Sequence, residues 1–160
     1  MFDYIFGLPM HALVVHAVVV LVPLVAVLAI AFGVLPRWRA VLRWPTAVGA
    51  VLSATAAWVA AESGEALLVR VSQVRSATTD FDLLRTHIDA GYRVRIVATI
   101  FMVVALAATW LLKPAAREDV GGRPLQVVVA VLLVAASLAL IVTVVLAGHA
   151  GSAAVWSGLG

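Results

Sequence analysis

The chain has 160 residues, of which 64% are hydrophobic and 12% charged, and its formal net charge is +3. A soluble domain of this size cannot bury so much apolar surface, so the composition predicts an integral membrane protein. The absence of cysteine excludes disulfides, thiolate metal sites and cysteine nucleophiles. The few basic residues lie near the ends of apolar segments, which argues against nucleic-acid binding and favours membrane orientation.

Four apolar segments follow one another along the chain, each close to the roughly 20 residues that a helix needs to cross a bilayer. We expect helices at about 9–35, 45–75, 80–113 and 124–149, because prolines suited to a first helical turn stand at Pro9, Pro45 and Pro124. The sequence shows no internal repeat. It predicts a single domain over 1–160, an all-α four-helix transmembrane bundle with an extended outer helical connection between helices two and three.

Charge and aromatic residues orient these helices. The segments after helices one and three carry basic residues, namely Arg37, Arg39 and Arg43, then Lys113, Arg117 and Arg123. The positive-inside rule places both segments in the cytoplasm and both termini outside. The bias toward Ala, Val and Arg is typical of GC-rich bacterial genomes. The expected location is therefore a bacterial cell membrane, in a multi-pass topology.

All four histidines fall near the outer ends of the expected helices. His11, His87 and His149 are each separated by the same length of sequence from a basic residue at the inner end (Arg37, Lys113 and Arg123), and His16 lies nearer to Arg37. Because each helical residue adds the same rise, three of the histidines share one height, and His16 is one layer lower. Ionisable groups at this depth in a membrane are candidate functional sites. The sequence therefore predicts one histidine cluster on the outer face.

The helical repeat limits how these histidines combine. His11 and His16 are five residues apart and about 140° apart around a straight helix, so they face different directions. One of them is expected to be a ligand and the other a supporting group. Glu62, Glu65 and Arg95 lie near the same height and complete the candidate site. Gly148 and Gly151 flank His149, where they let a flat group approach closely or simply cap the helix.

Three chemistries suit this cluster. Haem b takes two axial histidines, here His149 with His87 or His11, and its propionates suit Arg85, Arg93 or Arg95. A single zinc, copper or iron ion takes neutral imidazoles and a carboxylate from Glu62 or Glu65. The third is proton or quinone chemistry relayed by histidine and glutamate. Against all three stands a structural interpretation, in which the histidines meet interfacial water and Glu62 or Glu65 only pairs with Arg95.

Two motifs stand out, the opening Leu8-Pro9-Met10-His11 through His16 and the later Gly148-His149-Ala150-Gly151. With them the sequence resembles, over nearly its whole length, an uncharacterised bacterial membrane family known as domain of unknown function twenty-two thirty-one. The paired opening histidines are the most specific part of this resemblance. The family often has proline after the first histidine, where this chain has Ala12. The resemblance implies a four-helix inner-membrane protein. Some relatives look fused to Rieske-type iron–sulfur domains, which implies redox work.

The expected function is electron transfer, or an accessory role in a respiratory chain, by a cofactor bound to the outer histidines. The competing expectation is a structural or assembly subunit without a cofactor. A hydrolase is not expected, because no serine stands next to a base in a recognised arrangement. The expected partners are the lipid bilayer and other membrane proteins, with no nucleic acid. The sequence is also compatible with a homo-oligomer.

Overall fold

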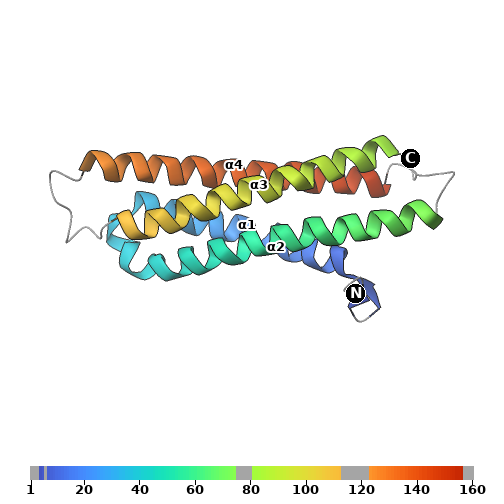
Figure 1. Cartoon of the computed structure of the whole chain (residues 1–160). Helices are drawn as coiled ribbons and strands as arrows, with labels where there is room; N and C mark the ends of the chain where they lie inside the picture. Colours follow the sequence, from blue (N-terminus) through green and yellow to red (C-terminus); the bar gives the residue numbers. More distant parts are fainter. Residues whose placement is uncertain (1–3, 6, 75–80, 113–122, 157–160) are drawn as a thin grey trace.

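The protein is described by a computed structural model, which covers residues 4–5, 7–74, 81–112 and 123–156 (Figure 1). Its elements are β1 (Tyr4–Ile5), β2 (Leu8–Pro9), α1 (Met10–Val34), the 3₁₀ helix η1 (Pro36–Trp38), α2 (Arg39–Val74), α3 (Phe81–Leu111) and α4 (Arg123–Trp156). The two short strands pair antiparallel in front of α1. All four α-helices are long and apolar enough to cross a membrane. The predicted all-α four-helix fold is therefore confirmed.

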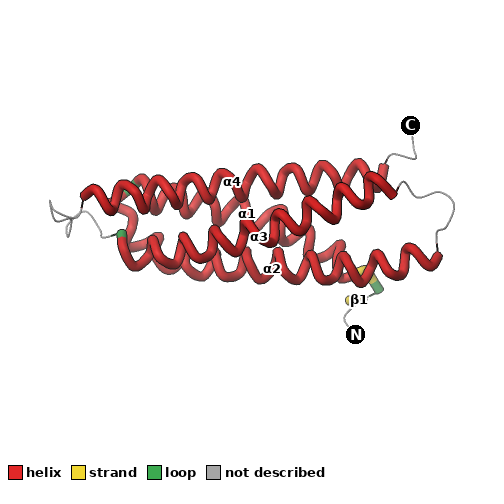
Figure 2. The backbone as a smooth tube through the Cα atoms, turned by 45° about the horizontal axis from the view of Figure 1, so that its top comes forward, coloured by secondary structure: helices red, strands yellow, loops and turns green. Residues whose placement is uncertain are grey.

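The four helices run side by side in one bundle, as the two views in Figures 1 and 2 show. Helices α1 and α3 each pack against α2 and α4, so α1 lies diagonally opposite α3. The start of α1 and the end of α4 lie at the same end of the bundle, which we call the histidine end. The opposite end, where α2 begins, is called the arginine end. Helix α2 is the longest and extends past the start of α1 at the histidine end, as expected for an extended connection.

Two helix boundaries differ from those expected. Helix α2 begins at Arg39, so Pro45 lies inside it instead of in its first turn. Pro36 takes the first-turn position, in the short 3₁₀ helix that leads into α2. Helix α4 continues to Trp156, so Gly148 and Gly151 are interior residues and not a C-cap. Near its end α4 lies against α3, because a Cβ at Gly151 would be 2.9 Å from the ring of His87.

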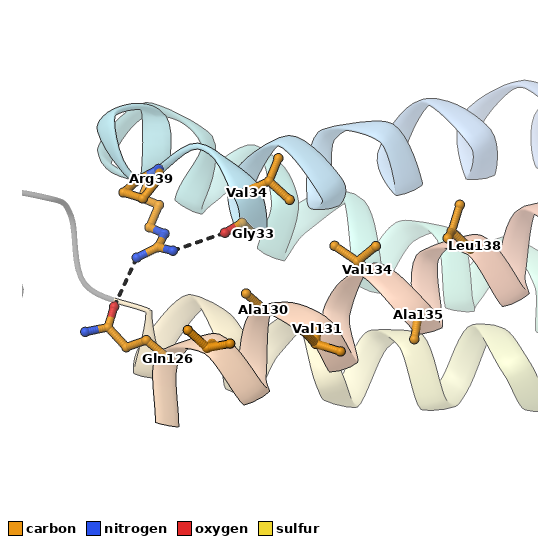
Figure 3. Close-up of a pocket in the computed structure, with 11 residues that line it drawn as sticks. Gly33, Val34, Arg39, Gln126, Ala130, Val131, Val134, Ala135 and Leu138 are labelled. Carbon is orange, nitrogen blue, oxygen red and sulfur yellow. Dashed lines mark hydrogen bonds between the residues drawn. The ribbon is translucent and has the colours of Figure 1, made fainter. Parts of the chain in front are cut away.

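At the arginine end, the buried side chain of Arg39 in α2 forms hydrogen bonds to α1 and α4 (Figure 3). Arg39 donates from Nε to the carbonyl of Phe32 at 3.3 Å and from Nη2 to that of Gly33 at 3.0 Å, which covers two carbonyls at the end of α1. Its Nη1 donates to Oε1 of Gln126 in α4 at 3.0 Å. Both side chains stand at the polar end of a groove of about 780 Å³ between α1 and α4, whose walls are mostly valine, alanine and leucine. The sequence placed Arg39 in an exposed basic loop, and the structure buries it.

The buried positions of the bundle repeat between its two halves. Adding 76 to the seven buried positions of α1 (18, 22, 25, 26, 29, 32 and 33) gives six buried positions of α3: 94, 98, 101, 105, 108 and 109. Subtracting 87 from the six buried positions of α4 (126, 129, 133, 137, 140 and 144) gives five buried positions of α2: 39, 46, 50, 53 and 57. Most buried positions of the hairpin α1–α2 therefore have buried counterparts in the hairpin α3–α4, whereas Ala47, Gly49 and Ala54 of α2 do not. Under these offsets His11 corresponds to His87, and Arg39 corresponds to Gln126.

Candidate histidine site

His11 and His87 lie next to each other at the histidine end. Their ring centroids are 6.1 Å apart, and the ring planes meet at 76°. The two residues come from the diagonal helices α1 and α3, and both are half-buried. The structure therefore brings two of the four histidines together in the interior of the bundle.

Each of these rings is held by the neighbouring helix of its own hairpin. Nδ1 of His11 lies 2.9 Å from the carbonyl oxygen of Ala60 in α2, and Nδ1 of His87 lies 3.2 Å from that of Ala147 in α4. A carbonyl oxygen only accepts hydrogen bonds, so Nδ1 carries the proton in both rings. Nε2 of each neutral ring then keeps its lone pair. This is the tautomer in which histidine binds metals and haem iron through Nε2.

Two glycines make room for these rings. Gly64 and Gly151 each lie four residues after the alanine whose carbonyl accepts the bond. A Cβ at Gly64 would lie 3.0 Å from Cε1 of His11, and one at Gly151 would lie 2.9 Å from Cε1 of His87. Ordinary van der Waals contact begins near 3.4 Å. The close approach predicted for Gly151 therefore exists, and the group that approaches is an imidazole of the same chain.

The residues around the two rings are related by the same offsets of 76 and 87 positions as the buried residues of the bundle. Ala60 and Ala147 are 87 positions apart, as are Gly64 and Gly151, and the two histidines are 76 apart. Each hairpin thus contributes one histidine, one carbonyl and one glycine. The two halves of the site differ at Ser63, whose Oγ lies 3.5 Å from Nδ1 of His11. The equivalent residue in the second hairpin is Ala150, which has no hydroxyl.

The other two histidines lie outside this pair. His16 is exposed on α1, and its Nδ1 donates to the carbonyl of Ala12 in its own helix at 2.5 Å. His149 is exposed on α4. Among the described residues, no three or more His, Asp or Glu side chains gather in a group that could hold a metal ion. The arrangement in these residues is a half-buried pair and two exposed histidines, where the sequence predicted one cluster of four.

The three charged candidates form a separate network on the side of the bundle shared by α2 and α3. Arg95 pairs with Glu62 at 3.1 Å, and the hydroxyl of Tyr92 donates to Glu65 at 2.5 Å. The Arg95 guanidinium also lies over the rings of Trp58 and Tyr92, at 4.4 Å and 4.8 Å from their centroids. The pairing of Glu62 with Arg95 that the structural interpretation anticipated is present. These contacts engage both carboxylates away from His11 and His87.

Sequence reasoning missed the two backbone carbonyls that hold the rings. Its one available signal was the repeated spacing of alanine and glycine, Ala60 to Gly64 in α2 and Ala147 to Gly151 in α4. Small residues four apart mark a helix face that a neighbour can approach closely. In this chain the group that uses that face is a histidine side chain. The resulting pair of imidazoles, each held through Nδ1, suits ligand binding through Nε2.

Comparison with known proteins agrees with the membrane fold. The chain matches no curated protein and no solved structure. The family described as predicted membrane protein (DUF2231) matches residues 7–159, a range that includes all four histidines and both ring-supporting glycines. The chain therefore belongs to the DUF2231 family of predicted membrane proteins.

Proposed function

We propose that this membrane protein binds a redox cofactor between His11 and His87 and works in electron transfer, as an accessory component of a respiratory chain. In this proposal the histidine end faces the outside of a bacterial inner membrane, with both termini there. The basic segments at the arginine end support that orientation. So do Arg43, Trp44 and Trp110 at the same end, where the guanidinium lies 5.9 Å and 5.2 Å from the two indole rings.

The observation that carries the proposal is the matched anchoring of the two rings. Both imidazoles donate from Nδ1 to a backbone carbonyl, so the Nε2 atom of each would be the one to hold a metal. A bond from a metal to an imidazole nitrogen is about 2 Å long, so two imidazoles that held one metal would have to lie close together. The observed separation of the centroids is 6.1 Å.

Haem b fits this donor set better than a bare ion. Its ring supplies four nitrogens, so two histidines complete the coordination of the iron. A bare zinc, copper or iron ion needs one or two further protein ligands for a closed site. Glu62 and Glu65 are engaged by Arg95 and Tyr92 instead. Haem would supply one-electron chemistry, and the chain would hold the two imidazoles and fix their tautomer.

A structural role is the second candidate, and the same hydrogen bonds support it. Each histidine joins two helices of its hairpin, so the pair also stabilises the packing of the histidine end. In this case the protein is an assembly or structural subunit without a cofactor. The two candidates differ in one measurable property, which is the presence of a chromophore or metal in the purified protein.

The experiment is an absorption spectrum and a metal analysis of the full chain, purified in detergent from a haem-producing host. A Soret band with about one haem per chain supports haem b. Stoichiometric metal without a Soret band overturns haem in favour of an ion. Neither signal, even after the purified chain is titrated with haem, overturns the cofactor proposal and favours the structural subunit.

A further inference from the structure

The two exposed histidines lie at one height on α1 and α4. A Cβ at Gly33 of α1 would lie 3.6–3.7 Å from Ala130, Leu133 and Val134 of α4, so Gly33 is level with about position 132. The two helices are antiparallel. His16 is as many residues from Gly33 (33 − 16) as His149 is from position 132 (149 − 132). Both histidines lie on the side of these positions that faces the histidine end. Each separation is about 26 Å along the helix axis.

The helical repeat also puts both histidines on one side of the bundle. Val25 contacts α2 at Gly49, and His16 is nine residues away, about 180° around α1. Gly151 faces His87 of α3, and His149 is two residues away, about 160° around α4 in the shorter direction. One histidine thus points away from α2 and the other away from α3. Because α1 and α4 are neighbours, both histidines therefore lie on the side of the bundle that these two helices share.

The repeated hairpin shows what occupies the equivalent place on the opposite side. The offsets relate His16 to Tyr92 (16 + 76) and His149 to Glu62 (149 − 87). There the guanidinium of Arg95 pairs with Glu62 and lies over the Tyr92 ring, so a cation connects these two residues. The residue equivalent to Arg95 is Val19 (95 − 76), an exposed apolar residue. On the α1–α4 side, His16 and His149 therefore take the places of Tyr92 and Glu62, and Val19 takes the place of the Arg95 cation.

We propose that His16 and His149 form a second site, which binds an external divalent transition-metal ion, Zn²⁺ or Cu²⁺, in the place of that guanidinium. Imidazole is a preferred ligand for both ions. Nδ1 of His16 is engaged by Ala12, so Nε2 keeps its lone pair for a metal. Ionisable side chains on the outside of a membrane helix are costly unless they have a partner. This site shares no residue with the His11–His87 pair and does not depend on the cofactor bound there.

The test is a competition titration of the purified full chain with Zn²⁺ alone, using a chromophoric chelator. Wild type is expected to bind one zinc ion, and His16→Ala and His149→Ala are each expected to weaken that binding at least about tenfold, a loss typical of damaged metal sites. Glu62→Gln is the matched control on the opposite side and is expected to bind zinc as wild type does. Unchanged zinc affinity in both histidine variants would overturn the site.

A double variant tests the geometry independently. The chain has no cysteine, so His16→Cys combined with His149→Cys introduces the only two thiols. Cd²⁺ is expected to protect both thiols from a maleimide in the double variant, and neither thiol in the two single variants. Equal labelling rates with and without Cd²⁺ in the double variant would show that the two positions do not share an ion.

Discussion

Replacing Gly151 by alanine changes the support of His87 without touching a ligand atom. The added Cβ would lie 2.9 Å from Cε1 of the ring, well short of the 3.4 Å at which ordinary contact begins. The ring must move away from α4, which stretches its 3.2 Å bond to the carbonyl of Ala147. A hydrogen bond of this kind contributes about 0.5–1.5 kcal/mol, so we expect cofactor affinity to fall by about 2- to 13-fold. Gly64→Ala is expected to act in the same way on His11.

Gly148→Ala provides the matched control, because nothing lies within 4 Å of its added Cβ. Both substitutions in α4 gain helix propensity, by up to about 1 kcal/mol. Gly148→Ala should therefore keep or raise thermal stability and bind the cofactor like wild type. Haem titration followed by absorbance measures the affinity, and thermal unfolding in detergent measures stability. Wild-type affinity and spectrum in both Gly64→Ala and Gly151→Ala would refute the idea that these glycines position the rings.

Three further predictions concern the rest of the bundle. Arg39→Ala removes three hydrogen bonds and leaves buried carbonyls unpaired, so we expect it to lower stability by about 2–4 kcal/mol, measured as the unfolding free energy in detergent; a negligible change would contradict its structural role. Cysteines at Ser152 and Ala40 should react with a membrane-impermeant maleimide from opposite sides of the membrane, and labelling of both from one side would contradict the topology. Glu65→Gln should leave cofactor binding unchanged, because Glu65 contacts Tyr92 and not the histidine pair; loss of binding would place this carboxylate in the site.

The membrane fold could be predicted from the sequence because bilayer-spanning helices have long apolar segments that few other structures need. The starts of α1, α3 and α4 follow from the same signal. The start of α2 does not, since Pro36 and Pro45 both suit a first turn and only the packed structure selects one. The end of α4 differs as well, because Gly151, a residue type that usually ends a helix, lies here inside α4 against the ring of His87.

The histidine pair could be predicted only in part. Residue counting gave His11 and His87 one height, and the helical repeat separated His11 from His16. Which histidines meet depends on which helices lie diagonally, and hydropathy does not contain that information. The internal repeat escaped detection for a related reason. The two hairpins share buried positions while the residues at those positions differ, as with Val25 and Phe101 or Thr46 and Leu133.

The most direct test of the central claim is to compare the four histidines in one experiment. Each is replaced by alanine in turn, and the absorption spectrum of each purified variant is recorded with haem supplied at saturation. We predict that His11→Ala and His87→Ala each lose the low-spin haem spectrum, whereas His16→Ala and His149→Ala keep that of wild type. A wild-type spectrum in His11→Ala or His87→Ala, or its loss in His149→Ala alone, would contradict the assignment of His11 and His87 as the ligands.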